Sequence, residues 1–339
     1  MPKISERCSE GDSQIRGYSD VGDLAFGRKG RIIASHFTYV ELYLVATEFL
    51  ILQGDNLNKL FPKEGVEMLG WSINGRKELI VLPGLICFSG DLSLLAYISA
   101  FGAVASIAVV VSVICTGAES VGFHERGRLF SSSGVIPAVS IFAFCYGGHA
   151  VYPTIYASMA HKKRFGCILL LCFLLCTINY GTIAVAGYMM YGDDVKSRET
   201  LNLREKLISS RIAIYTTLVN PFAKYSLLIA PMAMAIEERC HTESKIINSL
   251  STLAIRTLLV ISTVTVAVAV PFFGDLMVFI GSFLCTVVSM VLPCLCYLKI
   301  SWNRAPKSEL AFVLGILAMG VLITVGGTYS SVKQIVEHL

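Results

Sequence analysis

Long apolar runs separated by short polar connections make up the chain from residue 32 to its end. A helix that crosses a bilayer needs about 20 mostly apolar residues, because the hydrocarbon layer is ~30 Å thick and each residue rises ~1.5 Å. The pattern is that of an integral, multi-pass membrane protein. It predicts eight spanning helices, at Ile32–Leu52, Leu92–Cys115, Gly134–Ala157, Gly166–Met190, Ile212–Ile236, Leu250–Phe273, Leu276–Leu298 and Leu310–Tyr329.

A ninth crossing is expected at the shorter run Leu79–Phe88, which follows the charged residues 76–78. A helix of this length reaches only ~15 Å, so the segment either re-enters the membrane or crosses with a snorkelling polar start. Cytosolic loops are rich in Lys and Arg, and the basic residues before the first span share a side with the basic connector 161–164 only if this segment crosses. We therefore expect a membrane domain of about nine helices at residues 32–339, after a polar, disordered cytosolic tail at residues 1–31.

Composition narrows the class of protein. Of the 339 residues 54% are hydrophobic and 15% are charged, whereas a soluble domain has about 25% charged residues. The net charge of +4 does not indicate a nucleic-acid partner. Most of the 11 cysteines lie in apolar runs, where they act as small hydrophobic residues rather than as a disulfide framework. The chain has no phosphate-binding loop, dinucleotide glycine pattern, nucleophile elbow or zinc helix, so we expect neither an enzyme nor a bound cofactor or metal.

The most informative stretch, residues 144–153, reads Phe-Cys-Tyr-Gly-Gly-His-Ala-Val-Tyr-Pro in the middle of an apolar run. Gly147 and Gly148 weaken a helix, and Pro153 clashes with the carbonyl of His149 four residues earlier. Together they favour a helix that is broken at mid-membrane depth. Such breaks survive where they line a cavity, and their free amides and carbonyls suit the two charges of a small zwitterion.

Two readings of this stretch remain open on the sequence alone. Tyr146, Gly147, Gly148 and His149 are candidate substrate-binding residues if the break lines a cavity. The plainer reading is a proline kink with close helix packing through the two glycines. Likewise, His149 is either a proton carrier or a hydrogen-bonded packing residue.

A second polar group lies in the predicted span Ile212–Ile236. Thr216, Asn220 and Lys224 are spaced four residues apart and share one helix face, and a proline at position 221 frees the carbonyl of Thr217. Lys224 lies ~20 Å from the charged residues at either end of the span, too far to reach them. An intramembrane lysine is a candidate functional group.

This group too has two readings. The lysine either replaces a bound sodium ion or takes part in proton coupling, since a buried lysine titrates readily. Alternatively, it forms a structural ion pair with Glu41 or Glu48, which share a face of the first span. Arg256, one turn into its own span, is expected to snorkel to the membrane surface.

Four stretches resemble the amino acid/auxin permease family, in the branch of plant vacuolar amino-acid transporters related to the vesicular inhibitory amino-acid transporter. They are Phe144–Met159, Ile214–Glu238, Leu92–Ala100 and Tyr188–Gly192. The resemblance implies an all-α, polytopic helical bundle of LeuT-like (APC-type) architecture. It also implies secondary active transport of neutral amino acids, coupled to protons or to sodium by symport or antiport, in a vacuolar or other endomembrane or in the plasma membrane.

The resemblance also assigns roles to the two candidate groups. It implies that Gly147, Gly148 and His149 belong to the broken sixth helix. Thr216, Thr217 and Asn220 would belong to the eighth helix, which faces the ion-site region. Leu79–Phe88 would be the fourth helix.

One departure from the family stands out. The first two family helices have no counterpart in residues 1–31, and the resemblance implies that the first of them supplies half of the substrate site. The sequence therefore predicts an N-terminally truncated transporter domain. On that view a non-transporting or regulatory membrane isoform is the alternative to a transporter. A polytopic receptor or channel fits less well, because nine spans and a mid-membrane break are expected. The expected partners are neutral amino acids, protons or sodium, and the lipid bilayer.

Overall fold

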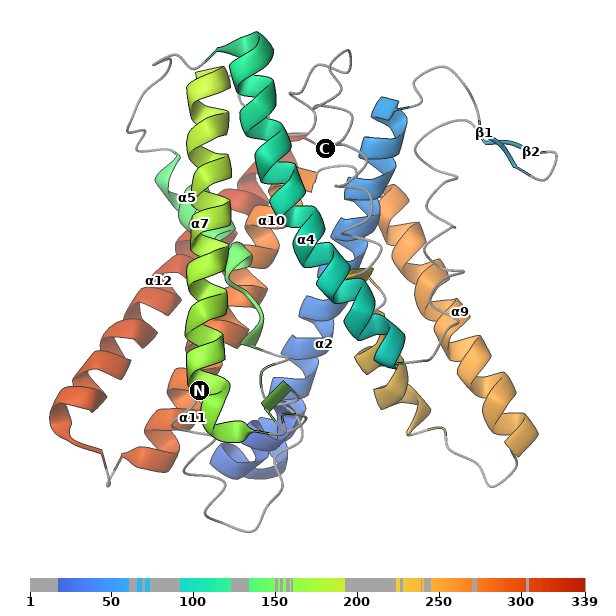
Figure 1. The fold of residues 1–339 in the computed structure, drawn as a ribbon. Helices are drawn as coiled ribbons and strands as arrows, with labels where there is room; N and C mark the ends of the chain where they lie inside the picture. Colours follow the sequence, from blue (N-terminus) through green and yellow to red (C-terminus); the bar gives the residue numbers. More distant parts are fainter. Residues whose placement is uncertain are drawn as a thin grey trace. The chain divides into compact units, whose positions relative to one another are not determined.

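The computed structural model describes twelve stretches of the chain and three single positions, and all structural statements below concern these residues. The stretches are 18–60, 66–68, 71–73, 92–122, 134–149, 155–156, 161–192, 224–225, 228–238, 245–269, 273–302 and 305–338, and the positions are 152, 159 and 240. Helices make up almost all of the described chain (Figure 1). The α-helices are α2 (Tyr18–Leu60), α4 (Leu92–Thr116), α5 (Val135–Cys145), α7 (Phe165–Tyr191), α9 (Lys245–Ala269), α10 (Phe273–Phe279), α11 (Leu292–Ser301) and α12 (Lys307–His338).

Wider and tighter helical turns join some of these elements. The π-helical stretch η2 (Gly117–Val121) extends α4, and a 3₁₀ turn, η4 (Lys162–Arg164), leads into α7. Between α10 and α11 the chain runs through two further π-helical stretches, η7 (Ile280–Cys285) and η8 (Val287–Val291). The helix formed by α10, η7, η8 and α11 is therefore widened along its middle.

Five helices of the described chain are long and apolar enough to cross a membrane, at Gly102–Glu119, Lys162–Tyr191, Leu250–Ala269, Leu276–Ser301 and Lys307–Val336. They fall on five of the spans expected from the apolar runs, which confirms a helical membrane protein. Two shorter apolar helices, Val135–Cys145 and Leu228–Glu237, overlap two further expected spans. The expected crossing at Leu79–Phe88 lies outside the described residues.

A short β-hairpin of the described chain was not predicted by the apolar pattern. Strand β1 (Val66–Met68) pairs antiparallel with β2 (Trp71–Ile73), with Val66 opposite Ile73 and Met68 opposite Trp71. The hairpin lies in a connection, so the helical fold class is unchanged.

The helix of the first expected span starts at Tyr18 rather than at Ile32. Gly27 has φ 63° and ψ −156°, a conformation that side chains disfavour, and it divides α2 into a short first segment and a long second one. A Cβ on Gly22 would lie 2.6 Å from the carbonyl oxygen of Gly30, so the two segments approach as closely as backbones can. Residues 18–31 are thus helical, and the expected tail boundary at residue 31 is wrong.

Two kinds of contact hold the first segment of α2 in place. The Arg31 guanidinium lies 3.7 Å from the Asp20 carboxylate and 3.8 Å from the Asp23 carboxylate. These charged residues, whose polarity suggested a tail, therefore form ion pairs with one another. On the other side, Val21 and Ala25 pack in a buried cluster with residues 296 and 297 of α11. The polar composition of this segment conceals an apolar face, and burial of that face favours a helix over a loose tail.

The described chain divides into two compact units, each described here by itself. The first unit comprises Met1–Glu41, Phe130–Cys176 and Asp275–Leu339, and the second comprises Leu42–Leu129 and Thr177–Gly274. Helices α2 and α7 each pass from one unit into the other. In the second unit α4 packs on α7 through a buried cluster of Val113, Ala186 and Met190.

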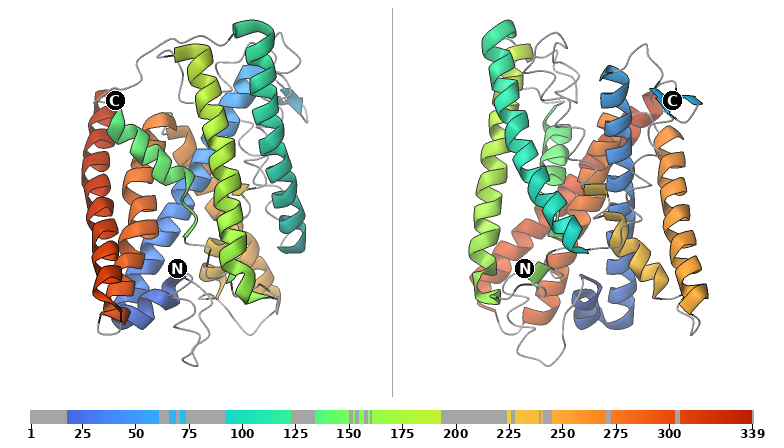
Figure 2. Two further views of the ribbon diagram at one scale, coloured as in Figure 1. Left: turned by 60° about the vertical axis from the view of Figure 1, so that its left-hand side comes forward. Right: turned by 45° about the vertical axis from the view of Figure 1, so that its right-hand side comes forward.

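Small residues bring α5, η7 and α12 of the first unit together (Figure 2). A Cβ on Gly281 of η7 would collide with the carbonyl oxygen of Ser140, and it would lie 3.0 Å from the Cβ of Phe144. A Cβ on Gly327 of α12 would collide with Ser282 and lie 2.6 Å from the Ser140 hydroxyl. Membrane helices pack closely where side chains are small, since apolar lipid gives no hydrophobic driving force between them.

We predict that Gly281→Ala destabilises the protein, because the new methyl group meets backbone and the helices must separate. The expected cost is about 1–3 kcal/mol, the usual range for overpacking a filled interior. Thermal unfolding in detergent, followed by loss of the monodisperse peak, measures it. Gly315→Ala in α12 is the matched control, because no atom lies within 4 Å of its added Cβ. Equal stability of the two variants would contradict this packing.

Candidate substrate and ion site

Helix α5 breaks at the glycine pair that the sequence singled out. The helix ends at Cys145, and Tyr146 leaves helical geometry with φ −101° and ψ 6°. The Gly147 N–H turns back to donate to the carbonyl of Phe144 at 3.0 Å, and neither Gly147 nor Gly148 is helical. The predicted break is therefore confirmed, and its backbone is no longer committed to a regular helical ladder.

Both glycines lie against neighbouring groups. A Cβ on Gly147 would lie 3.1 Å from the Sγ of Cys285 in η7, and one on Gly148 would lie 3.6 Å from the Tyr152 ring. The absence of side chains thus lets η7 and an aromatic ring approach the broken backbone directly.

His149 follows the break and is half-buried. Its ring centroid lies 4.9 Å from that of Tyr152, tilted by 49°. Its Nδ1 atom is buried and has no hydrogen-bond partner among the described residues. A buried ring nitrogen without a partner is costly, and a ligand that hydrogen-bonds to it would offset that cost.

Tyr146 is held on the other side of the break by aromatic packing. Its ring stacks on Phe173 of α7 at 5.8 Å and 11°, and it lies 4.6 Å from the ring of Phe142. Aromatic pairs at such distances add to the stability of buried contacts. Tyr146 therefore anchors the end of α5 to α7 within the first unit.

The π-helical stretches η7 and η8 present polar groups that the sequence analysis did not single out. A π-helix shifts hydrogen bonding from the fourth to the fifth preceding residue, and such distortions are frequent at functional sites. The Thr286 hydroxyl donates to the carbonyl of Gly281 at 2.8 Å, and the Tyr18 hydroxyl donates to that of Val288 at 2.6 Å. The apolar run 280–291 has no local pattern that distinguishes it from an ordinary span, so no sequence signal marked these groups.

The second polar group lies mostly beyond the described chain. Thr216, Thr217 and Asn220 are outside the described residues. Lys224 is exposed, and its Nζ lies 6.0 Å from the centroid of the Phe49 ring, within the second unit. These roles in ion coupling stay predictions.

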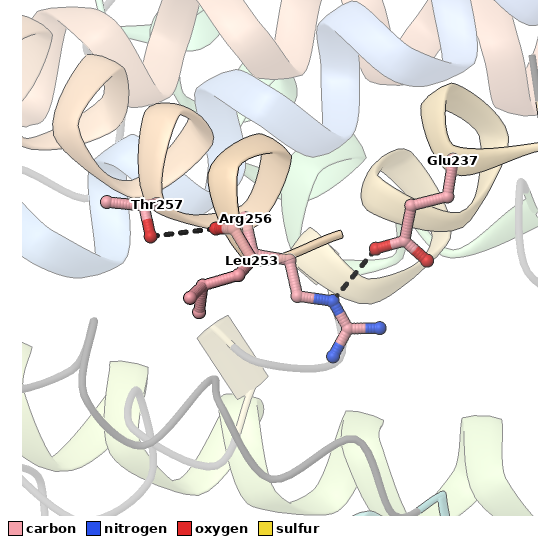
Figure 3. A network of polar contacts seen from close by, with 4 residues as sticks. All are labelled: Glu237, Leu253, Arg256 and Thr257. Atoms are coloured by element: carbon pink, nitrogen blue, oxygen red, sulfur yellow. Dashed lines mark hydrogen bonds and ion pairs between the residues drawn. The ribbon is translucent and has the colours of Figure 1, made fainter. Parts of the chain in front are cut away.

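An ion pair joins two helices of the second unit (Figure 3). The Arg256 Nε donates to Glu237 Oε1 at 2.9 Å, and the two side chains are 22% and 20% exposed. Arg256 therefore reaches the end of the neighbouring helix 228–237 instead of snorkelling alone. In the same unit, the fully buried Tyr225 shares a 2.7 Å hydrogen bond with Thr263 of α9.

Comparison with known proteins shows the family of the chain. A family model described as "Transmembrane amino acid transporter protein" matches residues 3–333. The chain belongs to this family. The family's members are transporters rather than enzymes, as the sequence led us to expect.

Individual relatives agree with this assignment. The amino acid transporter AVT1J of Arabidopsis thaliana is 44% identical over 98% of this chain and 80% of its own length. Amino acid transporter AVT1I of the same plant is also 44% identical, over 97% of this chain and 83% of the relative. Amino acid transporter AVT1C is 40% identical over 98% of the chain and 61% of the relative. The resemblance to the amino acid/auxin permease family is thereby confirmed.

We predict that Glu237→Gln and Arg256→Gln each lower stability by about 1–3 kcal/mol, the usual loss for a partly buried charge-assisted hydrogen bond. The double variant should lose less than the sum of the two single losses, because each single variant leaves a charge without its partner. Thermal unfolding in detergent measures all three. Additive losses would show that the two residues are not energetically coupled.

Proposed function

We propose that this protein is a secondary active transporter of neutral amino acids that uses a proton gradient, and that the broken helix at Tyr146–His149 binds the substrate. The observation that carries the proposal is the non-helical Gly147-Gly148 pair at the end of α5. In secondary transporters, discontinuous helices supply substrate sites. The names of the relatives support amino acids as the transported class.

The chemistry of the break suits an amino acid that carries no side-chain charge. Free backbone N–H groups can hold a carboxylate and free carbonyls can hold an ammonium. Among the described residues, the groups that these contacts place beside the break are the Cys285 thiol, the Tyr152 ring and His149, none of them a permanent charge. A charged substrate side chain would have no permanent countercharge among these neighbours, so a neutral one is favoured.

We further propose roles for the remaining candidates. Thr216, Thr217, Asn220 and Lys224 serve ion coupling on a second helix, and the chain follows the LeuT-like architecture with the break in its sixth helix. An endomembrane such as that of the vacuole is the proposed location. These assignments rest on the resemblance of residues 144–159 and 214–238 to the family motifs.

The test is uptake of labelled neutral amino acids by the purified chain in vesicles. A pH gradient of one direction or the other should drive accumulation of the labelled amino acid, and a sodium gradient of equal size should not. If only the sodium gradient drove accumulation, sodium would be the coupling ion instead of the proton. A folded chain that takes up no amino acid under either gradient would contradict the proposal and favour the non-transporting alternative.

Two substitutions test the proposed site. His149→Ala and Lys224→Met should each lower the rate of uptake by about tenfold or more, the loss that corresponds to ~1.4 kcal/mol of transition-state stabilisation. The matched controls are His161→Ala and Lys163→Met, which remove exposed side chains of the same types. Wild-type rates in both site variants would overturn the site assignment while leaving the transported class unaffected.

A further inference from the structure

Glu41 is a buried carboxyl group in the middle of α2 that the proposed function does not use. Glu41 is 6% exposed and lies within the first expected span. A charged group inside a membrane protein is expensive, so it is usually functional or paired. Glu41 forms no ion pair with any basic side chain of the described chain.

A short chain of contacts connects Glu41 to the broken helix. The Cys285 thiol of η7 donates a hydrogen bond to the Glu41 carboxyl group. The same sulfur atom lies 3.1 Å from the place where a Cβ on Gly147 would stand. Glu41, Cys285 and Gly147 all belong to the first unit, so the carboxyl group lies one side chain away from the broken backbone.

The carboxyl group still has an unused oxygen. Glu41 Oε2 is buried and has no hydrogen-bond partner among the described residues. One turn earlier on α2, the buried Thr38 hydroxyl also lacks a partner there. A buried acceptor without a donor costs free energy, and adding a proton to it removes both the charge and the missing bond.

Two titratable groups of the described chain face Glu41. One is the Cys285 thiol from η7, and the other is the Tyr18 phenol from the first segment of α2. The Tyr18 hydroxyl already donates to the carbonyl of Val288, so it does not supply the missing donor. Neither group carries a positive charge that would hold Glu41 as a carboxylate.

We propose that Glu41 carries the coupling proton, taking it up on its carboxylate beside the broken helix and releasing it to the other side of the membrane. The inference rests on the proposed proton-driven transport. In the step, one O–H bond forms on the carboxylate and later breaks, the charge changes between −1 and 0, and nothing is oxidised or reduced. Neutral Glu41 lets the helices close around the substrate, whereas a buried unpaired carboxylate opposes closure.

In this scheme Cys285 is a positioning residue. Its thiol holds one side of the carboxyl group while the other oxygen exchanges the proton. Cys285→Ser keeps a donor at this place and should keep the pH profile of uptake. Cys285→Ala removes the donor and should shift that profile, because the carboxylate form then loses its hydrogen bond.

The decisive variant is Glu41→Gln, which keeps the shape of the side chain and cannot release a proton. In vesicles, accumulation of a labelled neutral amino acid under a pH gradient should fall about tenfold or more. Counterflow exchange of labelled for unlabelled substrate at equal pH should stay within about twofold of wild type, since exchange needs no net proton movement. Glu119→Gln, which removes an exposed carboxyl group from η2, is the control.

Three results would overturn the inference. If the Glu41→Gln protein still accumulated substrate as the wild type does, another group would carry the proton. A folded Glu41→Gln that loses exchange together with accumulation would make Glu41 a binding or structural residue. Absence of pH-driven uptake by the wild-type chain would overturn the proposed function itself, and it is recognised before any variant is compared.

A second variant covers the case in which Glu41→Gln does not fold. Glu41→Asp retains a carboxyl group but moves it away from Cys285 by one methylene. It should keep pH-driven accumulation, with the pH dependence of uptake displaced from that of wild type. A folded Glu41→Asp with an unchanged pH dependence would count against a proton site at this position.

Discussion

The close approach of α5 to the π-helical stretch η7 is the contact on which the first unit depends. It exists because Gly281 has no side chain where the Ser140 carbonyl lies, and because Gly327 leaves the same freedom on α12. Inside a bilayer, apolar surface alone does not hold helices together. Close backbone packing therefore holds α5 in place, although the helix ends at Cys145.

That rigid support explains how the broken backbone persists. Non-helical peptide groups at membrane depth are tolerated only where protein or a cavity satisfies them. Here Cys285 of η7 stands directly beside Gly147, and the same thiol bonds to the buried Glu41. The break, the thiol and the carboxyl group thus adjoin one another within an apolar unit.

Sequence reasoning succeeded where the signal is local. Gly147 and Gly148 weaken a helix through their own conformational freedom, so the break was predicted and is present. It failed where polar residues conceal a packed face, as at Tyr18–Gly30, where a glycine turn and the ion pairs of Arg31 convert an expected tail into helix. Nor did it foresee the π-helical widening of residues 280–291, since no local pattern distinguishes it from an ordinary span.

The sequence by itself determined the class of protein: the apolar runs require a membrane, and the two long motifs mark a transporter family. Hydrophobicity and short motifs are properties of neighbouring residues, which is why they can be read along the chain. Only the tertiary structure decided that Glu41 of α2 and Cys285 of η7 meet beside Gly147, residues far apart in sequence. Such a meeting depends on which helix faces pack together, and close packing through Gly281 and Gly327 is what selects those faces.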